Sequence, residues 1–288
     1  MNRKEKVFHR IDENGVGLEI GPSHRPFAPK SQGYNVEIID HLSREQLLEK
    51  YKGHGVDLQS VEEVDHVWSG QSFEDLTGKS KFYDYIIASH VVEHAPDLVR
   101  FLQDCSAVLK DDGVVSLVIP DKRYCFDHFR PITGISRIVD AYFGQQKIHS
   151  PGSVAEYFLS VVAKSGNIAW NKYRFGNYSF MHSSADAKNG IDSVTNDGGY
   201  VDVHAWCFTP SSFRLIMHDL FLLGLIDLRE ICFFGTHGCE FYVTLGKHGS
   251  GPDKDRLGLL ADIELELASG APDLMLSKMM SALKFWRR

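Results

Sequence analysis

Short apolar runs alternate with amphipathic segments over the first 120 positions of the chain. Five runs have the length and composition of buried strands: residues 16–21, 34–40, 64–68, Tyr83–Ser89 and 113–120. Nearly continuous apolar strands separated by helices are typical of a parallel sheet that is covered on both faces. The pattern therefore predicts an α/β fold for this part of the chain.

Two segments between these runs carry clear helix signals. Ser43 stands three residues before Gln46, the capping-box spacing that opens a helix, here expected to continue through Tyr51. After Pro96, apolar residues recur at the spacing of one helix face: Leu98, Phe101, Leu102, Cys105, Val108 and Leu109. Gly113 provides the stop signal after this helix.

The pattern changes between about residues 122 and 200, where aromatic residues, His, Asn and Gly become dense. We expect helices over Ile135–Phe143 and 154–163 and a loop-rich segment over 170–199. An insert of this size in a compact domain is usually functional, often as a lid. Residues 122–200 are therefore predicted to form an acceptor-binding lid.

The sheet pattern resumes after the insert. Thr209 and Pro210 supply the cap and the first position of a helix. The runs 228–234 and 240–245 then form a predicted hairpin, so the last strand is expected to be antiparallel to its neighbour. This assigns residues 1–249 to the main domain and 250–288 to a tail with helices over 256–267 and 274–286.

Composition narrows the class of protein. The chain has 288 residues and a formal net charge of −7, and its Lys and Arg residues are scattered, so no electrostatic footprint for nucleic acid is visible. Its five cysteines include no Cys-x-x-Cys pair and are expected to be reduced thiols in a cytoplasmic protein. The polar N-terminus lacks the apolar core of a secretion signal, and no apolar run is long enough to span a membrane.

A nucleoside site is indicated at the ends of the first two strands. Gly21 ends the first strand, and Asp40 ends the second strand 19 residues later. An acid at this place can bind the two ribose hydroxyls. A G-x-G-x-x-G turn is absent, which favours a nucleoside without phosphates. The alternative is that Gly21 is a plain turn and Asp40 a helix cap.

The motifs of residues 16–22 (Val-Gly-Leu-Glu-Ile-Gly-Pro), 83–97 and 109–121, taken with Asp40, resemble those of class I S-adenosylmethionine-dependent methyltransferases. They are closest to those associated with bacterial surface-glycan biosynthesis. The resemblance covers residues 14–121 and 205–246. It implies a Rossmann-like, mostly parallel seven-stranded sheet with an antiparallel last strand and helices on both faces, and S-adenosylmethionine as the cofactor.

The resemblance also implies a set of cofactor-binding residues: Glu19, Gly21, Asp40, Trp68, Ser69, Gly70, Ser89 and His90. The first two would lie at the methionine part and Asp40 at the ribose. The three residues after the third strand would line the adenine, and the last two would face the transferred methyl group. The second glycine of the usual first motif is missing, so the first helix is expected to be short or displaced.

An alcohol acceptor needs a base, and histidine is suited to that role near neutral pH. We choose His204 first, with Asp202 or a neighbouring acid as its orienting partner, because it lies where the insert returns to the sheet. The alternative is a histidine that packs beside Trp206. Asp121 after the fifth strand is the second candidate, with a loop cap as its alternative, and His182 is the third.

Residues 90–94 match H-x-x-E-H, a zinc-protease pattern that needs both histidines on one helix face. A strand up to Ser89 and a proline at Pro96 leave little room for such a helix, and no third ligand can be identified. The sequence therefore predicts no zinc site. Asp121, Asp202 and His204 are donors that suit Mg²⁺, but we assign no metal.

The favoured function is methyl transfer to a hydroxyl of a sugar or glycan-type acceptor. A nucleotide-sugar dehydrogenase or epimerase is a weaker alternative, because it needs the glycine-rich turn and usually a Tyr-x-x-x-Lys pair, which the chain lacks. A third possibility is a catalytically silent methyltransferase-like subunit that binds a glycan-assembly protein through residues 250–288.

Overall fold

A seven-stranded sheet forms the centre of the molecule. The structure is a computed structural model that describes residues 1–171, 176–196 and 198–268. The strand order is β3-β2-β1-β4-β5-β9-β8. The strands are β1 (Gly17–Ile20), β2 (Val36–Asp40), β3 (His66–Val67), β4 (Tyr83–Ser89), β5 (Leu109–Pro120), β8 (Arg229–His237) and β9 (Glu240–Gly246). The first five are parallel, and β9 is antiparallel to β5 and β8, which confirms the predicted sheet.

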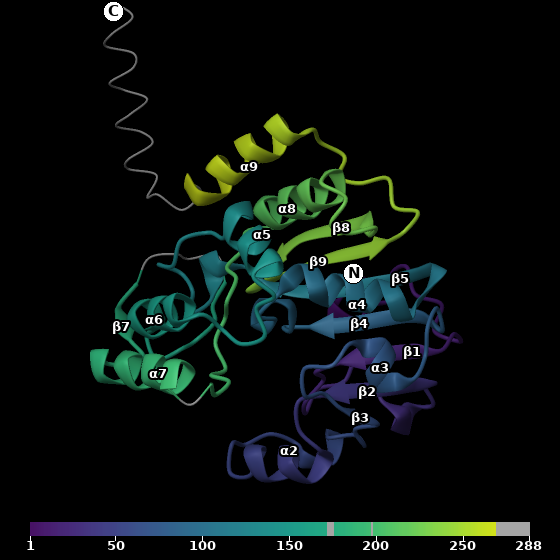
Figure 1. Cartoon of the computed structure of the whole chain (residues 1–288), viewed down its shortest axis with the longest axis horizontal. Coiled ribbons are helices and arrows are strands. Elements are labelled where there is room, and N and C mark those ends of the chain that lie inside the picture. Colours follow the sequence, from purple (N-terminus) through teal and green to yellow (C-terminus); the bar gives the residue numbers. More distant parts are fainter. Residues whose placement is uncertain (172–175, 197, 269–288) are drawn as a thin grey trace, which may run out of the picture.

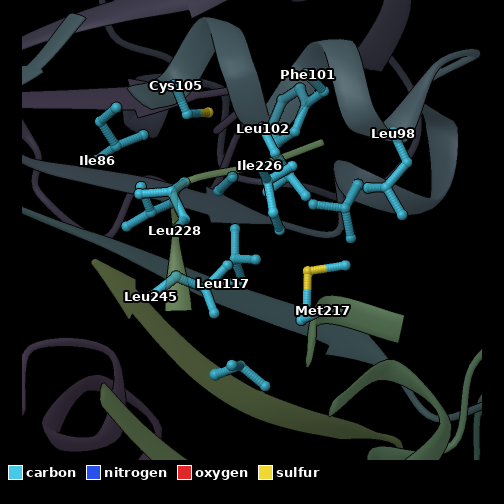
Figure 2. Packing of buried hydrophobic residues seen from close by; sticks show 14 of the residues in the cluster. Ile86, Leu98, Phe101, Leu102, Cys105, Leu117, Met217, Ile226, Leu228 and Leu245 are labelled. Carbon is cyan, nitrogen blue, oxygen red and sulfur yellow. The ribbon is translucent and has the colours of Figure 1, made fainter. Parts of the chain in front are cut away.

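One face of the sheet is covered by helices with an apolar side. These helices are α3 (Phe73–Thr77), α4 (Leu98–Val108), α5 (Ile135–Phe143) and α8 (Pro210–Leu222). Figure 2 shows Leu102 and Cys105 of α4 and Met217 of α8 packed around Leu117 and Leu245 of the sheet. Their burial follows from the predicted helix period, since residues three and four apart share one helix face.

The other face is covered largely by irregular chain. Val7 and Phe8 of the α1 region (Arg3–Val7) pack with Phe27 against Tyr85 and Tyr242 of the sheet. Between β1 and β2 the chain forms only a short 3-10 turn, η1 (Lys30–Gln32). The expectation of a short or displaced first helix is therefore confirmed.

The insert forms a lobe beyond the end toward which β4 points (Figure 1). It contains α6 (Pro151–Ser160), a two-stranded β6 (Val162–Lys164) and β7 (Tyr178–Phe180) sheet, and α7 (Ser184–Asn196). Helices α6 and α7 lie close together where Gly190 faces Val154. A Cβ at Gly190 would come 2.9 Å from Cγ1 of Val154. Val154, Val194 and Val203 give the lobe a small core of its own.

Several elements differ from the prediction. The described part of 170–199 is not mainly loop, because α7 takes 13 of its residues and β7 takes three. The helix expected over 154–163 begins earlier and ends earlier, since Ser150 caps it and Pro151 takes its first position. The third strand is reduced to two paired residues.

β5 begins at Leu109 rather than at residue 113, and the short helices α1 and α3 were not predicted. α2 (Arg44–Tyr51) has the predicted capping box, and α9 (Arg256–Ala268) is the first tail helix. The second tail helix, expected over 274–286, lies outside the described residues. All five cysteines are free, and Cys105, Cys125 and Cys207 are buried. No described helix is long and apolar enough to cross a membrane.

Candidate active site

The ends of β1 and β4 meet closely at the carboxyl edge of the sheet. Gly21 has a φ of +62°, and its N–H donates to the Ile39 carbonyl at 2.8 Å. A Cβ at this position would come 3.0 Å from Cγ2 of Val91. The left-handed backbone and the close approach both require glycine. This is the place where open parallel sheets bind ligands.

Two buried carboxylates hold the loop that follows β1. Glu19 accepts hydrogen bonds from the backbone N–H groups of Phe27 at 2.7 Å and Ala28 at 3.0 Å. Burial raises the pKa of Glu19 to about 7, although both amide bonds oppose the shift. Asp40 accepts a bond from the Ser23 N–H at 3.1 Å. Glu19 therefore anchors the loop that replaces the usual glycine-rich turn.

Asp40 is buried but retains acceptor capacity. Its Oδ1 accepts bonds from the backbone N–H of His41 at 2.7 Å and pairs with Nδ1 of the same residue at 2.6 Å. Its Oδ2 accepts only the Ser23 bond, whereas a carboxylate oxygen has two acceptor positions. The covering imidazole of His41 is 45 % exposed. The carboxylate can therefore take a ribose hydroxyl once His41 moves aside.

The turn after β3 places an aromatic ring beside this edge. Trp68 is half-buried against the main core and donates from Nε1 to the Gln71 carbonyl at 2.8 Å. Ser69 and Gly70 are exposed in the same turn, and Gly70 has a φ of +105°. An exposed turn next to a fixed indole ring is suited to a flat aromatic ligand such as adenine.

α1 closes over the end of β4. Arg3 donates to Ser89 Oγ at 3.2 Å and from Nε to Oε1 of Glu240 at 2.7 Å. His90 has a left-handed backbone (φ +55°), unusual for a residue with a side chain, and its Nε2 lies 2.9 Å from Oε2 of Glu240. Glu240 therefore links the N-terminal helix to the β4 turn, and such strained turns tend to occur at functional sites.

Glu240→Gln is expected to destabilise the protein in a pH-dependent way. Burial opposes ionisation, but hydrogen bonds from His90, Arg3 and Tyr242 lower the pKa of Glu240 from 4.5 to about 2. The unfolded chain then binds more protons as pH falls, so the contribution is complete above pH 4.5 and disappears toward pH 2. We expect a loss on the order of 2–3 kcal/mol in the free energy of unfolding at pH 7, measured by urea denaturation.

The matched control for that experiment is Glu264→Gln, since Glu264 is an exposed carboxylate on α9. It is expected to leave stability unchanged at either pH. A Glu240→Gln penalty of equal size at pH 7 and pH 3 would contradict the assigned role of its charge.

A second cluster, which we call the His204 centre, joins the insert to the sheet edge; it comprises Glu93, His94, Asp127, Asp202 and His204. His204 is buried, and its Nδ1 lies 2.5 Å from Oδ2 of Asp127. Asp127 also pairs with Arg130 at 2.7 Å. Burial opposes ionisation, but His204 and Arg130 hold the pKa of Asp127 well below its ordinary value. With Nδ1 donating to this carboxylate, the neutral form of the His204 ring has its lone pair on Nε2.

His204 was expected to be oriented by Asp202 or a neighbouring acid, and the acid that pairs with it is Asp127 rather than Asp202. Asp202 instead pairs with Nδ1 of His94 at 2.8 Å. The two imidazole rings stand perpendicular with centroids 4.6 Å apart. Each histidine of the centre therefore has a carboxylate of its own.

Glu93 lies in the 3-10 turn η3 (Val92–His94) and is fully buried. Neither of its carboxylate oxygens has a hydrogen-bond partner among the described residues. Its backbone carbonyl accepts a bond from the Ala205 N–H at 2.7 Å. This bond ties the β4 turn to the segment that carries His204.

The other two catalytic candidates do not join this centre. Both oxygens of Asp121 accept bonds from Arg123, and Oδ2 also accepts one from Thr236 at 2.5 Å. Its side chain is fully buried, so we correct its role to that of a structural anchor. His182 packs against Phe158 at 4.7 Å between ring centroids, in the lobe rather than at the His204 centre.

The strand order and the antiparallel β9 are those of a class I, Rossmann-like methyltransferase. A family model described as a methyltransferase domain matches residues 2–183. The chain therefore belongs to the methyltransferase domain family, and its cofactor is S-adenosylmethionine. A search of curated proteins found no match.

The matches among solved structures share little sequence with the chain and have TM-scores below 0.5. A methyltransferase from Methanosarcina mazei is 15 % identical, with 85 % of this chain and 97 % of that one covered and a TM-score of 0.42. One from Mesorhizobium loti is 10 % identical, with coverages of 85 % and 98 % and a TM-score of 0.42. Trans-methyltransferase CalH, solved with S-adenosylhomocysteine, is 13 % identical to the chain. The match covers 83 % of this chain and 53 % of that one, with a TM-score of 0.40.

Proposed function

We propose that the protein transfers a methyl group from S-adenosylmethionine to a hydroxyl of a sugar or glycan-type acceptor, which binds beneath the lobe of residues 122–200. The observation that carries the proposal is the buried His204–Asp127 pair, 2.5 Å between Nδ1 and Oδ2. It leaves a basic Nε2 next to the turn after β4, on the side of the sheet edge where the methyl group would be presented.

The cofactor supplies an electrophilic methyl group on a sulfonium. The residues present fit it: Gly21 admits it to the edge, Asp40 binds the ribose, and Trp68 with Ser69 and Gly70 borders the adenine. Ser89 and His90 lie at the methyl end. The hydroxyl oxygen must be aligned with the carbon–sulfur bond and must lose its proton as it attacks. His204 is the residue on which activation of that hydroxyl depends.

The acceptor class is supported by the rings around the His204 centre. The Phe126 ring lies 4.6 Å from the His204 ring, and the Tyr157 ring lies 6.4 Å from it, centroid to centroid. His182 stands next to Tyr157 on the lobe side, at 5.9 Å. Aromatic rings mixed with polar tips suit the apolar faces and hydroxyls of a sugar.

Methyl transfer with label from S-adenosylmethionine, followed by mass spectrometry of a panel of nucleotide sugars and glycans, tests this function. We expect one labelled methyl group per acceptor, on a hydroxyl oxygen, and S-adenosylhomocysteine as the second product. Transfer to a nitrogen or a thiol, with no hydroxyl in the panel modified, would contradict the proposal.

A further inference from the structure

We propose that Glu93, His94 and His204 together bind one divalent transition-metal ion of the Zn²⁺ type. A carboxylate oxygen of Glu93 and one nitrogen of each imidazole lie within 4.8 Å of one another. Nε2 of His204 is 3.9 Å from Oε1 of Glu93. Two imidazoles and one carboxylate are a donor set found in catalytic zinc sites, which keep a further position open for water or substrate.

The state of Glu93 points to a missing cation. Its side chain is 0 % exposed, and neither oxygen has a hydrogen-bond partner among the described residues. A buried carboxylate without hydrogen bonds is strongly unfavourable unless it is paired or coordinates a metal. An ion between Glu93 and the two histidines would satisfy it.

The two histidines are oriented as ligands by acids outside the trio. Nδ1 of His204 faces Asp127 at 2.5 Å, and Nδ1 of His94 faces Asp202 at 2.8 Å. When the rings are neutral, as metal binding requires, this leaves the lone pair of each on Nε2. Carboxylates that bind the far nitrogen of a histidine are the usual support of metal-ligating imidazoles, because they fix both tautomer and ring orientation.

The trio is not the protease motif that the sequence suggested. His90, the first residue of the H-x-x-E-H pattern, bonds Glu240 through Nε2, and its Nδ1 lies 3.5 Å from Oε1 of Glu93 without a hydrogen bond. Its place is taken by His204, which the Ala205–Glu93 backbone bond holds against η3. Glu93 and His94 therefore serve as ligands without a helix, and the third ligand comes from the far end of the insert.

A catalytic role for this ion rests on the proposed function. Binding of the ion does not. A hydroxyl bound to a divalent ion loses its proton to water near neutral pH far more readily than a free one. Its oxygen can then form the bond to the methyl carbon while the carbon–sulfur bond breaks and leaves the electron pair on sulfur. The ion would thereby explain why activation depends on His204.

Metal binding is tested on the full chain, purified without an affinity tag and treated with a chelator, by calorimetric titration with Zn²⁺ and by absorption with Co²⁺. We expect one ion per chain and a Co²⁺ spectrum without a thiolate charge-transfer band, which excludes the free cysteines as ligands. Mg²⁺ is not expected to compete, because it prefers oxygen donors. His94→Ala and His204→Ala should weaken binding at least about 100-fold.

Two further variants separate a ligand from a supporting group. Asp202→Asn should weaken Zn²⁺ binding about 10- to 100-fold and keep the Co²⁺ spectrum, since only the support of His94 is lost. His237→Ala, at an exposed position on β8, is the matched control and should bind Zn²⁺ like the unaltered chain.

Glu93→Gln provides a test that does not depend on activity. It removes a buried carboxylate that accepts no hydrogen bond among the described residues, so the metal-free variant should melt about 2–4 °C above the metal-free unaltered chain. Zn²⁺ should raise the melting temperature of the unaltered chain and not that of the variant. No Zn²⁺ binding by the unaltered chain, or equal Zn²⁺ stabilisation of Glu93→Gln, would overturn the site.

Failure of the two proposals can be told apart. A chain that binds Zn²⁺ through this trio but methylates no hydroxyl contradicts the proposed function and supports the ion site. Hydroxyl methylation that is unchanged after the ion has been removed supports the proposed function and overturns the catalytic role of the ion.

Discussion

Asp40→Ala is expected to abolish stabilisation of the chain by S-adenosylhomocysteine. At 100 times its dissociation constant, this ligand should add about 2.7 kcal/mol to the free energy of unfolding of the unaltered chain, and NAD should add nothing. Hydrogen bonds to a charged carboxylate contribute about 1.5–3 kcal/mol each. Loss of two such bonds to the ribose raises the dissociation constant at least about 100-fold, which calorimetric titration measures.

Asp40 also holds the Ser23 amide, so a control must separate ribose binding from loop support. His41→Ala removes the exposed imidazole that covers Asp40 and leaves the carboxylate in place. It is expected to bind S-adenosylhomocysteine as tightly as the unaltered chain or more tightly. The unaltered chain should bind S-adenosylhomocysteine more tightly than its 2′-deoxy analogue. Asp40→Asn should lose this preference. If Asp40→Asn keeps that preference, the acid does not bind the ribose.

The centre of the sheet could be predicted because its strands are buried on both faces and therefore form continuous apolar runs. In β4, for example, all but two of the seven residues are buried. Such runs depend on local sequence alone. The edge strand β3, by contrast, has no buried residue. The order of the strands required the resemblance to a known family, since spacing along the chain does not reveal which parallel strands are neighbours.

α7 was missed because its buried face is made of small residues. Ala187, Gly190 and Val194 face the lobe, and they give little apolar signal although their spacing is helical. A start signal was present: Ser183 and Asp186 satisfy each other's backbone N–H groups across three residues. Reading that capping pair would have placed the helix.

The sequence indicated where the candidate residues lie but not which residues they pair with. His204 lies where the insert returns to the sheet, but Asp127, its hydrogen-bond partner, stands far from it in the sequence. The sequence placed Asp121 correctly at the end of β5, yet Arg123 two residues later occupies its carboxylate. Partners of this kind depend on how the insert folds back, which no local pattern records.

His204→Ala is expected to reduce turnover by about 10²- to 10⁴-fold, the range found when a group that activates the attacking atom is removed. Binding of S-adenosylhomocysteine should stay within about threefold of that of the unaltered chain, because none of the cofactor contacts assigned above involves His204. Initial rates at saturating cofactor, together with calorimetric titration, measure both quantities. A loss in kcat without a loss in cofactor affinity places the residue at the acceptor and not at the nucleoside.

The choice between a catalytic and a packing histidine follows from comparing three variants. A histidine that only packs beside Phe126 and His94 would lower the melting temperature of His204→Ala and leave kcat per folded molecule intact. His237→Ala should change neither quantity. Asp127→Asn should lower kcat while His204 is still present, because an amide in place of the carboxylate no longer fixes the lone pair on Nε2. Turnover of His204→Ala within threefold of the unaltered chain, per folded molecule, would remove His204 from the mechanism and with it the acceptor side of the site.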